Sequence, residues 1–282
     1  MTVALRPPIP YFGGKITVGP AIAALLPAHA HYIEPYAGSL AVLGAKAPSR
    51  HETVNDLDEH LVAFFRVLRD RREELREVCR WTPHARAEYR DSRIDAMPAD
   101  LPDLERARRV WVQLTQGRAG NLLATGWRHV VKPEGSSISM PAYLDGYVDR
   151  IAPFAERLRD VSLECLPALD LIAKYGQHPS VLLYVDPPYL GAVREARGYR
   201  HEMRDDVDHR QLAEALHGCH AAVVLSGYAS DLYDRELYTG WDRHSIAAST
   251  GQGGTWANRT EVLWSNRPLG QQMSLLDALD VR

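Results

Sequence analysis

A run of five apolar residues that stops at an acid and two prolines is the feature of this sequence that most restricts its fold. The run is Val181-Leu182-Leu183-Tyr184-Val185, and Asp186-Pro187-Pro188-Tyr189 follows it directly. A strand that is apolar on both faces is typical of the centre of a parallel sheet, which helices cover on both sides. Because proline has no N–H to donate to a neighbouring strand, the strand is expected to end there.

Strand and helix patterns alternate along most of the chain. Apolar runs predict further strands at residues 31–34, 52–54, 161–165 and 221–225, and two late strands near 244–248 and 260–265. Helical spacing predicts helices at residues 39–46, 57–80, 144–159 and 208–218, and another that begins at residue 168. This order predicts an α/β protein with a doubly wound, Rossmann-like sheet.

The segment from residue 66 to residue 128 departs from that pattern. It holds 14 Lys or Arg against 10 Asp or Glu, in a chain of net charge −3. Gly, Pro and polar residues also interrupt its apolar spacing. We therefore expect an inserted, mainly helical module at residues 71–143, a main domain made of residues 1–70 and 144–268, and a C-terminal tail at residues 269–282.

The cysteines and the longest apolar stretches exclude several classes of protein. Cys79, Cys165 and Cys219 are far apart and odd in number, which fits neither a metal site nor a disulfide framework. No stretch approaches the roughly 18 to 20 apolar residues of a membrane helix. Residues 1–10 lack the apolar core of a signal peptide. We expect a monomeric cytoplasmic protein that binds neither a metal ion nor a membrane.

The segment after the apolar run offers chemistry for an amino group on a planar ring. Open α/β sheets bind ligands beyond the carboxyl ends of their strands. There Asp186 and the Pro187 carbonyl can accept hydrogen bonds from one exocyclic amine, and Tyr189 can stack on the ring. Two such acceptors favour a tetrahedral nitrogen whose lone pair points at a methyl donor. The alternative is a simple turn that ends the strand, because Asp-Pro is common in turns.

Two other segments offer a place for a ligand. Tyr32-Ile33-Glu34-Pro35-Tyr36-Ala37-Gly38-Ser39 runs from a strand into a turn of small residues, which lets a ligand approach the backbone. Asp56 follows the second strand, where an acid commonly binds ribose hydroxyls, but an N-cap of the next helix is an equally good interpretation. Upstream, Tyr11-Phe12-Gly13-Gly14-Lys15 adds a flat face and a charge, although alone it indicates only a turn.

In this order, the segments resemble the Dam-like class of S-adenosylmethionine-dependent DNA adenine-N6 methyltransferases. The resemblance covers most of the chain except the inserted module. It implies S-adenosylmethionine as cofactor and a DNA-recognition role for the module. It also implies roles for single residues around the cofactor: Tyr11 and Lys15 line its pocket, its methionine end lies over Glu34, Pro35 and Gly38, and Asp56 holds its ribose. In the catalytic loop, the resemblance implies that Asp186 serves both the methyl donor and the adenine, and that Pro187 and Tyr189 belong to the same loop.

Two positions depart from that family. Members often have a small residue where this chain has Leu40. They also often have an acid after the third strand, near the adenine of the cofactor, where this chain has Pro167. Asp170 lies one helical turn too far along to replace that acid. Both departures concern the cofactor pocket and not the reaction.

Candidate contacts to double-stranded DNA lie in the inserted module. Arginine can bind guanine or phosphate, and asparagine can bind adenine. We select Arg118, Asn121, Trp127 and Arg128, whereas a solvated helix face accounts better for Arg71, Arg72, Arg106 and Arg108. The target base must be extruded from the duplex. Residues 194–204 and 249–259 are expected to be loops that fold over it.

The tail holds a short pattern with two interpretations. Gln272-Met273-Ser274-Leu275-Leu276 resembles the peptide with which bacterial replication proteins bind the sliding clamp, with Gln272, Leu275 and Leu276 as its contacts. The alternative, which we prefer, is a short amphipathic helix that packs Leu275, Leu276 and Leu279 on the domain, because five-residue patterns often arise by chance.

The function expected from the sequence is site-specific methyl transfer to adenine N6 in DNA, by a bacterial or phage-encoded enzyme. Methylation of cytosine N4 uses the same amine chemistry, often with a serine in place of Asp186, and identification of the methylated nucleoside separates the two. A DNA-binding protein without catalytic activity is a third possibility. A nicotinamide oxidoreductase is disfavoured because the chain lacks the G-x-G-x-x-G fingerprint.

Overall fold

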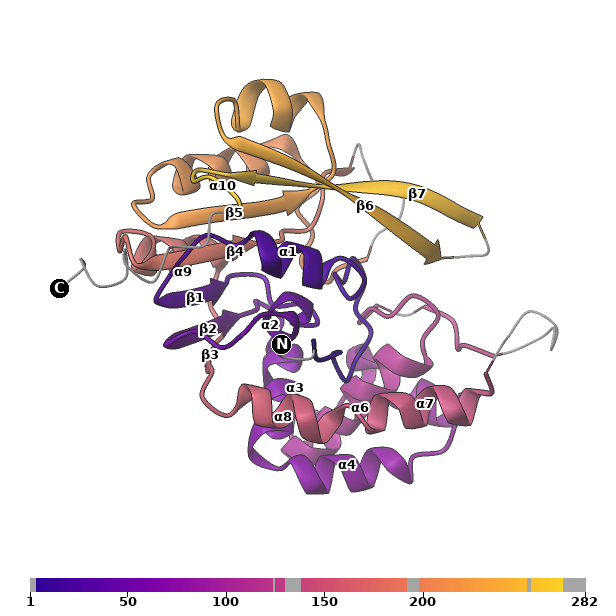
Figure 1. The fold of residues 1–282 in the computed structure, drawn as a ribbon. Helices are drawn as coiled ribbons and strands as arrows, with labels where there is room; N and C mark the ends of the chain where they lie inside the picture. Colours follow the sequence, from indigo (N-terminus) through magenta and orange to yellow (C-terminus); the bar gives the residue numbers. More distant parts are fainter. Residues whose placement is uncertain (1–3, 124, 130–137, 192–197, 253–254, 271–282) are drawn as a thin grey trace.

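The computed structural model describes residues 4–123, 125–129, 138–191, 198–252 and 255–270. These residues form a seven-stranded sheet in the order β3-β2-β1-β4-β5-β7-β6 (Figure 1). Strands β3, β2, β1, β4 and β5 run parallel to one another, whereas β7 is antiparallel to both β5 and β6. The strands are β1 (His31–Glu34), β2 (His51–Asn55), β3 (Ser162–Glu164), β4 (Val181–Val185), β5 (Ala222–Gly227), β6 (Asp242–Gln252) and β7 (Thr255–Ser265).

Strand β4 lies at the centre of the sheet, as its sequence predicts. It pairs with β1 on one side and β5 on the other, and all five of its residues are buried. The chain winds outward through β2 and β3 from β1, and in the other direction through β5 from β4. The carboxyl ends of β1 and β4 therefore form the switch point at which such sheets bind ligands.

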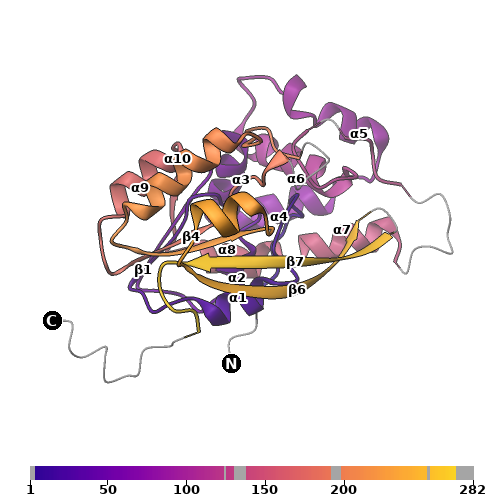
Figure 2. The same cartoon turned by 90° about the horizontal axis from the view of Figure 1, so that it is seen from above.

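Helices cover both faces of the sheet, which confirms the doubly wound fold. One face packs against α9 (Ala168–Tyr175), α10 (Asp206–His217) and a π-helical turn, η4 (Leu232–Leu237); its buried residues include Leu183, Val185 and Leu225. The other face packs against α1 (Gly19–Leu25), α2 (Ala41–Ala45), α3 (Glu59–Asp70) and α8 (Ile151–Leu158) (Figure 2). Leu182 and Tyr184 of β4 belong to this second core.

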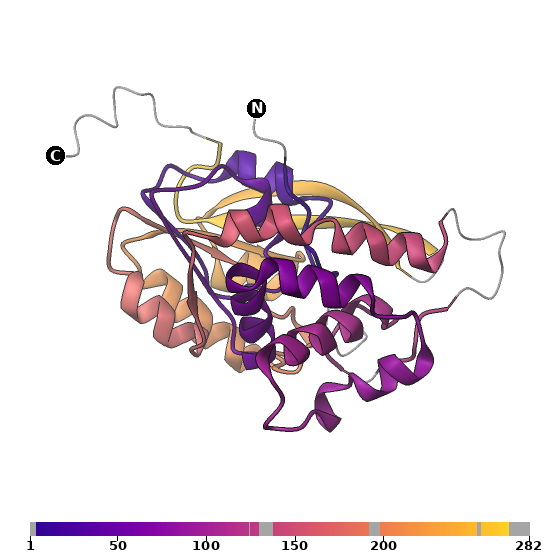
Figure 3. The same cartoon turned by 90° about the horizontal axis from the view of Figure 1, so that it is seen from below.

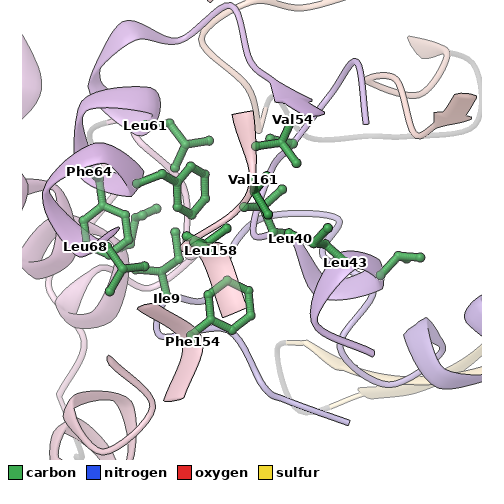
Figure 4. Close-up of a cluster of buried hydrophobic side chains, with 14 of the residues drawn as sticks. Ile9, Leu40, Leu43, Val54, Leu61, Phe64, Leu68, Phe154, Leu158 and Val161 are labelled. Atoms are coloured by element: carbon green, nitrogen blue, oxygen red, sulfur yellow. The ribbon is translucent and has the colours of Figure 1, made fainter. Parts of the chain in front are cut away.

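The predicted module is helical, but it shares its core with the main domain. It contains α4 (Arg72–Arg80), α5 (Arg86–Asp91), η1 (Ile94–Ala96) and α6 (Asp103–Gln116), followed by α7 (Met140–Val148) (Figure 3). Trp111 of α6 lies in one apolar cluster with Phe64 of α3 and Phe154 of α8. Figure 4 shows part of this cluster, in which Phe64 and Leu68 lie near Phe154 and Leu158. The expected boundary after residue 143 falls inside α7.

Two helices predicted as continuous are broken in the structure. The predicted helix at 57–80 is α3 and α4, which are separated at Arg71, whose backbone has φ −135° and ψ 43°. The predicted helix at 144–159 is α7 and α8. Pro153 explains this second break, because a proline fits the first turn of a helix but clashes with the carbonyl four residues earlier in a continuous one. Helices α1, α5 and α6 were not predicted.

The late strands are longer than predicted. Strands β6 and β7 pair one residue to one residue from Asp242 opposite Ser265 to Gln252 opposite Thr255, and the hairpin extends beyond the rest of the sheet (Figure 2). The prediction of a loop at 249–259 is therefore wrong. Pairing between β6 and β7 continues to Gln252 and Thr255, although β5 pairs with β7 only from Val262 to Ser265. The tail residues Gln272, Leu275 and Leu276 lie outside the described residues. No helix in the described ranges is long and apolar enough to span a membrane.

Candidate active site

A cavity of about 270 Å³ lies at the switch point of the sheet. It is bounded by the residues that follow β1, β2 and β4, and by the N-terminal segment that precedes α1. The predicted residues Tyr11, Lys15, Glu34, Pro35, Gly38, Asp56 and Asp186 all line it. The structure thus brings Lys15 and Asp186, which lie 171 positions apart in the sequence, together in one cavity.

The floor of the cavity consists of backbone with little side-chain cover. Gly38 has a φ of 49°, and a Cβ at Gly14 would lie 2.8 Å from the Tyr11 carbonyl oxygen, so neither position tolerates a side chain easily. The buried Ser39 hydroxyl has no hydrogen-bond partner among the described residues. Leu40 also lies in the left-handed region, with φ 61°, a conformation that glycine adopts more easily than any residue with a Cβ.

Asp56 is not the cap of the following helix. Asp58 caps α3, because its carboxylate accepts a hydrogen bond from the backbone N–H of His60 at 3.1 Å. Asp56 instead accepts bonds from the N–H groups of Gly38 (3.1 Å) and Asp58 (2.9 Å) and lines the cavity. Burial raises its pKa to about 6. The capping alternative for Asp56 is therefore excluded.

Asp186 is held by Lys15 at the carboxyl end of β4. Its Oδ1 accepts a hydrogen bond from the Lys15 ammonium at 2.8 Å, and the Tyr189 hydroxyl lies 3.1 Å from the same oxygen. Lys15 is only 5% exposed and also donates to the Gly13 carbonyl. Burial raises the pKa of Asp186 to about 6, and Lys15 opposes that rise. Burial would lower the pKa of Lys15, but Asp186 and Glu261 raise it above its usual value.

Tyr189 is fixed by its hydroxyl as well as by its ring. The hydroxyl lies 2.6 Å from Oε1 of Glu261 on β7, and the ring packs edge to face on Tyr228, with centroids 4.7 Å apart. Oε1 of Glu261 also accepts a hydrogen bond from Ser226 at 2.7 Å. Glu261 and Ser226 were not predicted as site residues. The one available signal was the charge of Glu261, directly before the apolar residues Val262-Leu263-Trp264.

Glu34 has an internal role in addition to its place in the cavity wall. Its Oε1 accepts hydrogen bonds from the Tyr32 hydroxyl at 2.7 Å and from the Leu43 N–H at 2.9 Å. Burial raises its pKa to about 8. Glu34 therefore ties the end of β1 to α2 and fixes the shape of the turn between them.

The segment after the catalytic loop covers the cavity in part. Residues 199–203 line it, and Arg200 forms an ion pair of 3.0 Å with the buried Asp58. Tyr36 donates a hydrogen bond to the Met203 sulfur at 3.5 Å. The described part of the predicted loop at 194–204 thus folds over the site; residues 194–197 lie outside the description.

Comparisons with known proteins identify the family of this chain. Residues 11–250 match the model of the D12 class N6 adenine-specific DNA methyltransferases. The chain belongs to this family. Over 281 residues it is 28% identical to the Type II methyltransferase M1.LlaDCHI of Lactococcus lactis subsp. cremoris, covering 94% of this chain and 96% of the relative. Two structures of the rRNA methyltransferase aviRa from Streptomyces viridochromogenes align over 87% of the chain, at 14% identity and TM-scores of 0.36 and 0.34, and cover 80% of that protein.

The methyltransferase thus transfers a methyl group from S-adenosylmethionine to the N6 of adenine in DNA, as the resemblance predicted. The cavity fits this cofactor. The Ser39 hydroxyl, which has no partner among the described residues, and the close backbone of Gly14 can meet polar groups of a ligand. Leu57 and Leu169 are 45% and 39% exposed and line the cavity beside Pro167, where they can contact a planar ring.

Most arginines of the helical region are neutralised by acids. Arg108 pairs with Glu88 and Glu105, and Arg71 pairs with Glu74. Four arginines in the described part of the methyltransferase's module make no ion pair with a described residue: Arg86, Arg106, Arg118 and Arg128. Arg118 and Arg128 lie in one hairpin, which is formed by the bridge between Gly117 and Trp127, and Arg86 lies over the Trp127 ring.

The predicted DNA contacts occupy different environments in this hairpin. Arg118 is exposed. Arg128 donates to the carbonyls of Gly117 and Arg118 and lies over the Tyr143 ring, 5.2 Å from its centroid. Trp127 is stacked between the rings of His84 and His129, at 4.5 and 5.5 Å, with Arg86 over it. Asn121 is buried, and its Oδ1 accepts from the Leu123 N–H at 3.2 Å, so it is not a surface contact in this conformation.

Proposed function

We propose that Asp186 and the Pro187 carbonyl accept the two hydrogens of the adenine N6 amine, with the Tyr189 ring beside the base. The observation that supports this most is the unequal use of the two oxygens of Asp186. Oδ1 accepts from Lys15 and lies 3.1 Å from the Tyr189 hydroxyl, whereas no described residue donates to Oδ2. The Pro187 carbonyl also accepts no hydrogen bond from the described chain. Two acceptors are thus available side by side.

The charges around Asp186 suit the reaction. Bound S-adenosylmethionine supplies an electrophilic methyl group. As the amine nitrogen forms its bond to the methyl carbon, positive charge develops on the nitrogen, and the carboxylate of Asp186 stabilises it. Lys15 keeps that carboxylate ionised in a buried site. The bond between the methyl carbon and the sulfonium sulfur would break as the new bond forms, with its electron pair going to sulfur, and one amine proton would then pass to solvent. No metal ligand or covalent link to the protein takes part in this scheme. Methyl transfer from labelled cofactor, followed by identification of the product nucleoside, tests it.

We assign the cofactor ribose to Asp56, because its carboxylate is buried, lines the cavity and has no role as a helix cap. Asp56→Ala is expected to raise the Kd for S-adenosylmethionine about tenfold or more, since hydrogen bonds to a charged group contribute about 1.5–3 kcal/mol. Isothermal titration with the cofactor measures this. Asp170→Ala, one helical turn beyond Pro167, is the control and should leave the Kd unchanged; an unchanged Kd for Asp56→Ala would contradict the assignment.

We propose that the hairpin at residues 117–128 faces the DNA. Arg118 and Arg86 provide charge that no described acid neutralises, and Gly120 lies against Pro10, next to the cavity residue Tyr11. The hairpin therefore lies beside the site where the target base must arrive. Trp127 and Arg128 are proposed to hold the hairpin in shape, through the stack with His84 and the bonds to backbone carbonyls.

Arg118→Ala is expected to weaken DNA binding several-fold and to lower the salt dependence of binding by about one unit of slope, as loss of one phosphate contact does. Fluorescence anisotropy with a labelled duplex at several salt concentrations measures both. Arg71→Ala removes an arginine that Glu74 already neutralises, so it serves as the matched control. Equal losses for the two variants would place the DNA elsewhere.

Two further predictions concern the oligomeric state of the enzyme and the partner of its tail. We propose that the enzyme is a monomer, which light scattering of the full chain tests. For the tail, a pull-down of a bacterial sliding clamp by the intact chain and by a variant with Gln272 and Leu275 changed to alanine separates the two interpretations, because only the clamp peptide predicts a loss.

A further inference from the structure

A second buried carboxylate lies beside Asp186. Glu261 is 4% exposed on β7, accepts hydrogen bonds from the hydroxyls of Tyr189 and Ser226, and lies 3.8 Å from the Lys15 ammonium. We propose that Glu261 is a positioning residue for adenine methylation. It accepts the hydrogen bond of the Tyr189 hydroxyl and shares the Lys15 cation, so that Asp186 remains able to accept a hydrogen bond from the amine. This proposal rests on the proposed role of Asp186.

The first part follows from the number of protons. The Tyr189 hydroxyl has one hydrogen to donate and two carboxylates within reach, Glu261 at 2.6 Å and Asp186 at 3.1 Å. The shorter distance assigns the proton to Glu261. Tyr189 is thereby fixed against β7, and Asp186 is spared a second donor at Oδ1 that would draw its negative charge away from the amine at Oδ2.

The second part concerns charge. Lys15 lies between Asp186 at 2.8 Å and Glu261 at 3.8 Å, so one buried cation faces two carboxylates. The titratable or charged groups that act on Asp186 are Lys15 from the N-terminal segment, Tyr189 from its own loop and Glu261 from β7. Glu34 at the end of β1 and Tyr184 on β4 are the next nearest. Among these, Glu261 raises the pKa of Asp186, whereas Lys15 lowers it.

The test is Glu261→Gln, which keeps the shape and one acceptor but removes the charge. Tyr189 then donates to the stronger acceptor, Asp186. We expect kcat to fall about tenfold with the KM for S-adenosylmethionine nearly unchanged, because a mispositioned acceptor affects the transition state more than cofactor binding. The acid limb of the kcat/KM profile should move to lower pH by about one unit, since a nearby negative charge has been removed. A purely structural role would not move this limb.

Two further variants make the result decisive. Glu52→Gln removes the charge of another buried carboxylate, that of Glu52 on β2, which pairs with Lys46 and Arg157. This variant controls for loss of stability and should leave the acid limb in place. In a Tyr189→Phe background there is no hydroxyl proton to redirect, so Glu261→Gln should lower kcat less than it does in the wild type.

The outcomes separate the proposed role of Glu261 from the proposed role of Asp186. An acid limb that stays at the wild-type position in Glu261→Gln, or additive effects of the two changes at Glu261 and Tyr189, would overturn the role of Glu261. Asp186→Asn with wild-type turnover would instead overturn the role of Asp186 itself. A low-pH shift of the limb together with a smaller effect in the Tyr189→Phe background supports the proposal.

Discussion

Asp186→Asn is expected to lower the turnover of DNA by about a thousandfold or more, while the Kd for S-adenosylmethionine changes much less. Asparagine has the shape of aspartate but no charge, and its N–H₂ group would oppose the amine of the base instead of accepting from it. The fold should survive, because Lys15 keeps Glu261 within 3.8 Å as a counter-charge. Transfer of a labelled methyl group gives the turnover, and titration with cofactor gives the Kd.

A matched control for this change is available away from the cavity. Asp234 is a half-buried aspartate that accepts hydrogen bonds from Arg243 and from the indole N–H of Trp264. Asp234→Asn should leave turnover within a factor of about two, as changes outside the site usually do. If Asp186→Asn retained more than a few per cent of the turnover, the amine-acceptor role would have to be assigned to another group.

The second large effect is expected at Lys15. Lys15→Met removes the cation that stabilises ionised Asp186 and leaves two buried carboxylates near each other, so the pKa of Asp186 should rise further. At about pH 7 we expect kcat/KM to fall about a hundredfold, because most of the enzyme would then hold protonated Asp186. Raising the pH should recover part of this loss.

The pH profile of kcat/KM is expected to reveal the direction in which each change moves the pKa of Asp186. On the proposed role of Asp186, activity of the wild type requires its ionised form, so kcat/KM should fall as the pH drops through about 6. In Lys15→Met the same fall should begin at a higher pH, whereas in Glu261→Gln it should begin at a lower one. Stopped assays across buffers of constant ionic strength measure all three profiles. A Lys15→Met profile with the wild-type acid limb would show that Lys15 does not act through Asp186.

Local sequence was sufficient to predict the sheet and the cavity. Val181–Val185 could only be a buried strand, and the acid and prolines after it mark the end of that strand. Because parallel strands present their carboxyl ends at one edge, Glu34, Asp56 and Asp186 had to converge once the strands were known. The resemblance to a methyltransferase family then supplied the cofactor.

Contacts between distant segments were not predictable in the same way. Glu261 lies 72 positions from Tyr189, and its role depends on β7 running antiparallel beside β5. Helix α6 was missed because Arg108 and Arg109 interrupt its apolar spacing; the structure neutralises both with Glu105. The burial of Asn121 and the stacking of Trp127 depend equally on tertiary contacts that single residues do not reveal.

The apolar cluster that joins α6 to α3 and α8 has a consequence for the proposed contact between the hairpin and DNA. Exchange of the whole helical region with that of a relative would have to reproduce the fit of Trp111 against Phe64 and Phe154, where even small changes of volume are costly. Within the hairpin at residues 117–128, Leu122 belongs to that cluster, whereas the exposed Arg118 does not. On the proposed role of the hairpin, specificity can therefore diverge through exposed positions such as Arg118 while the framework stays constant.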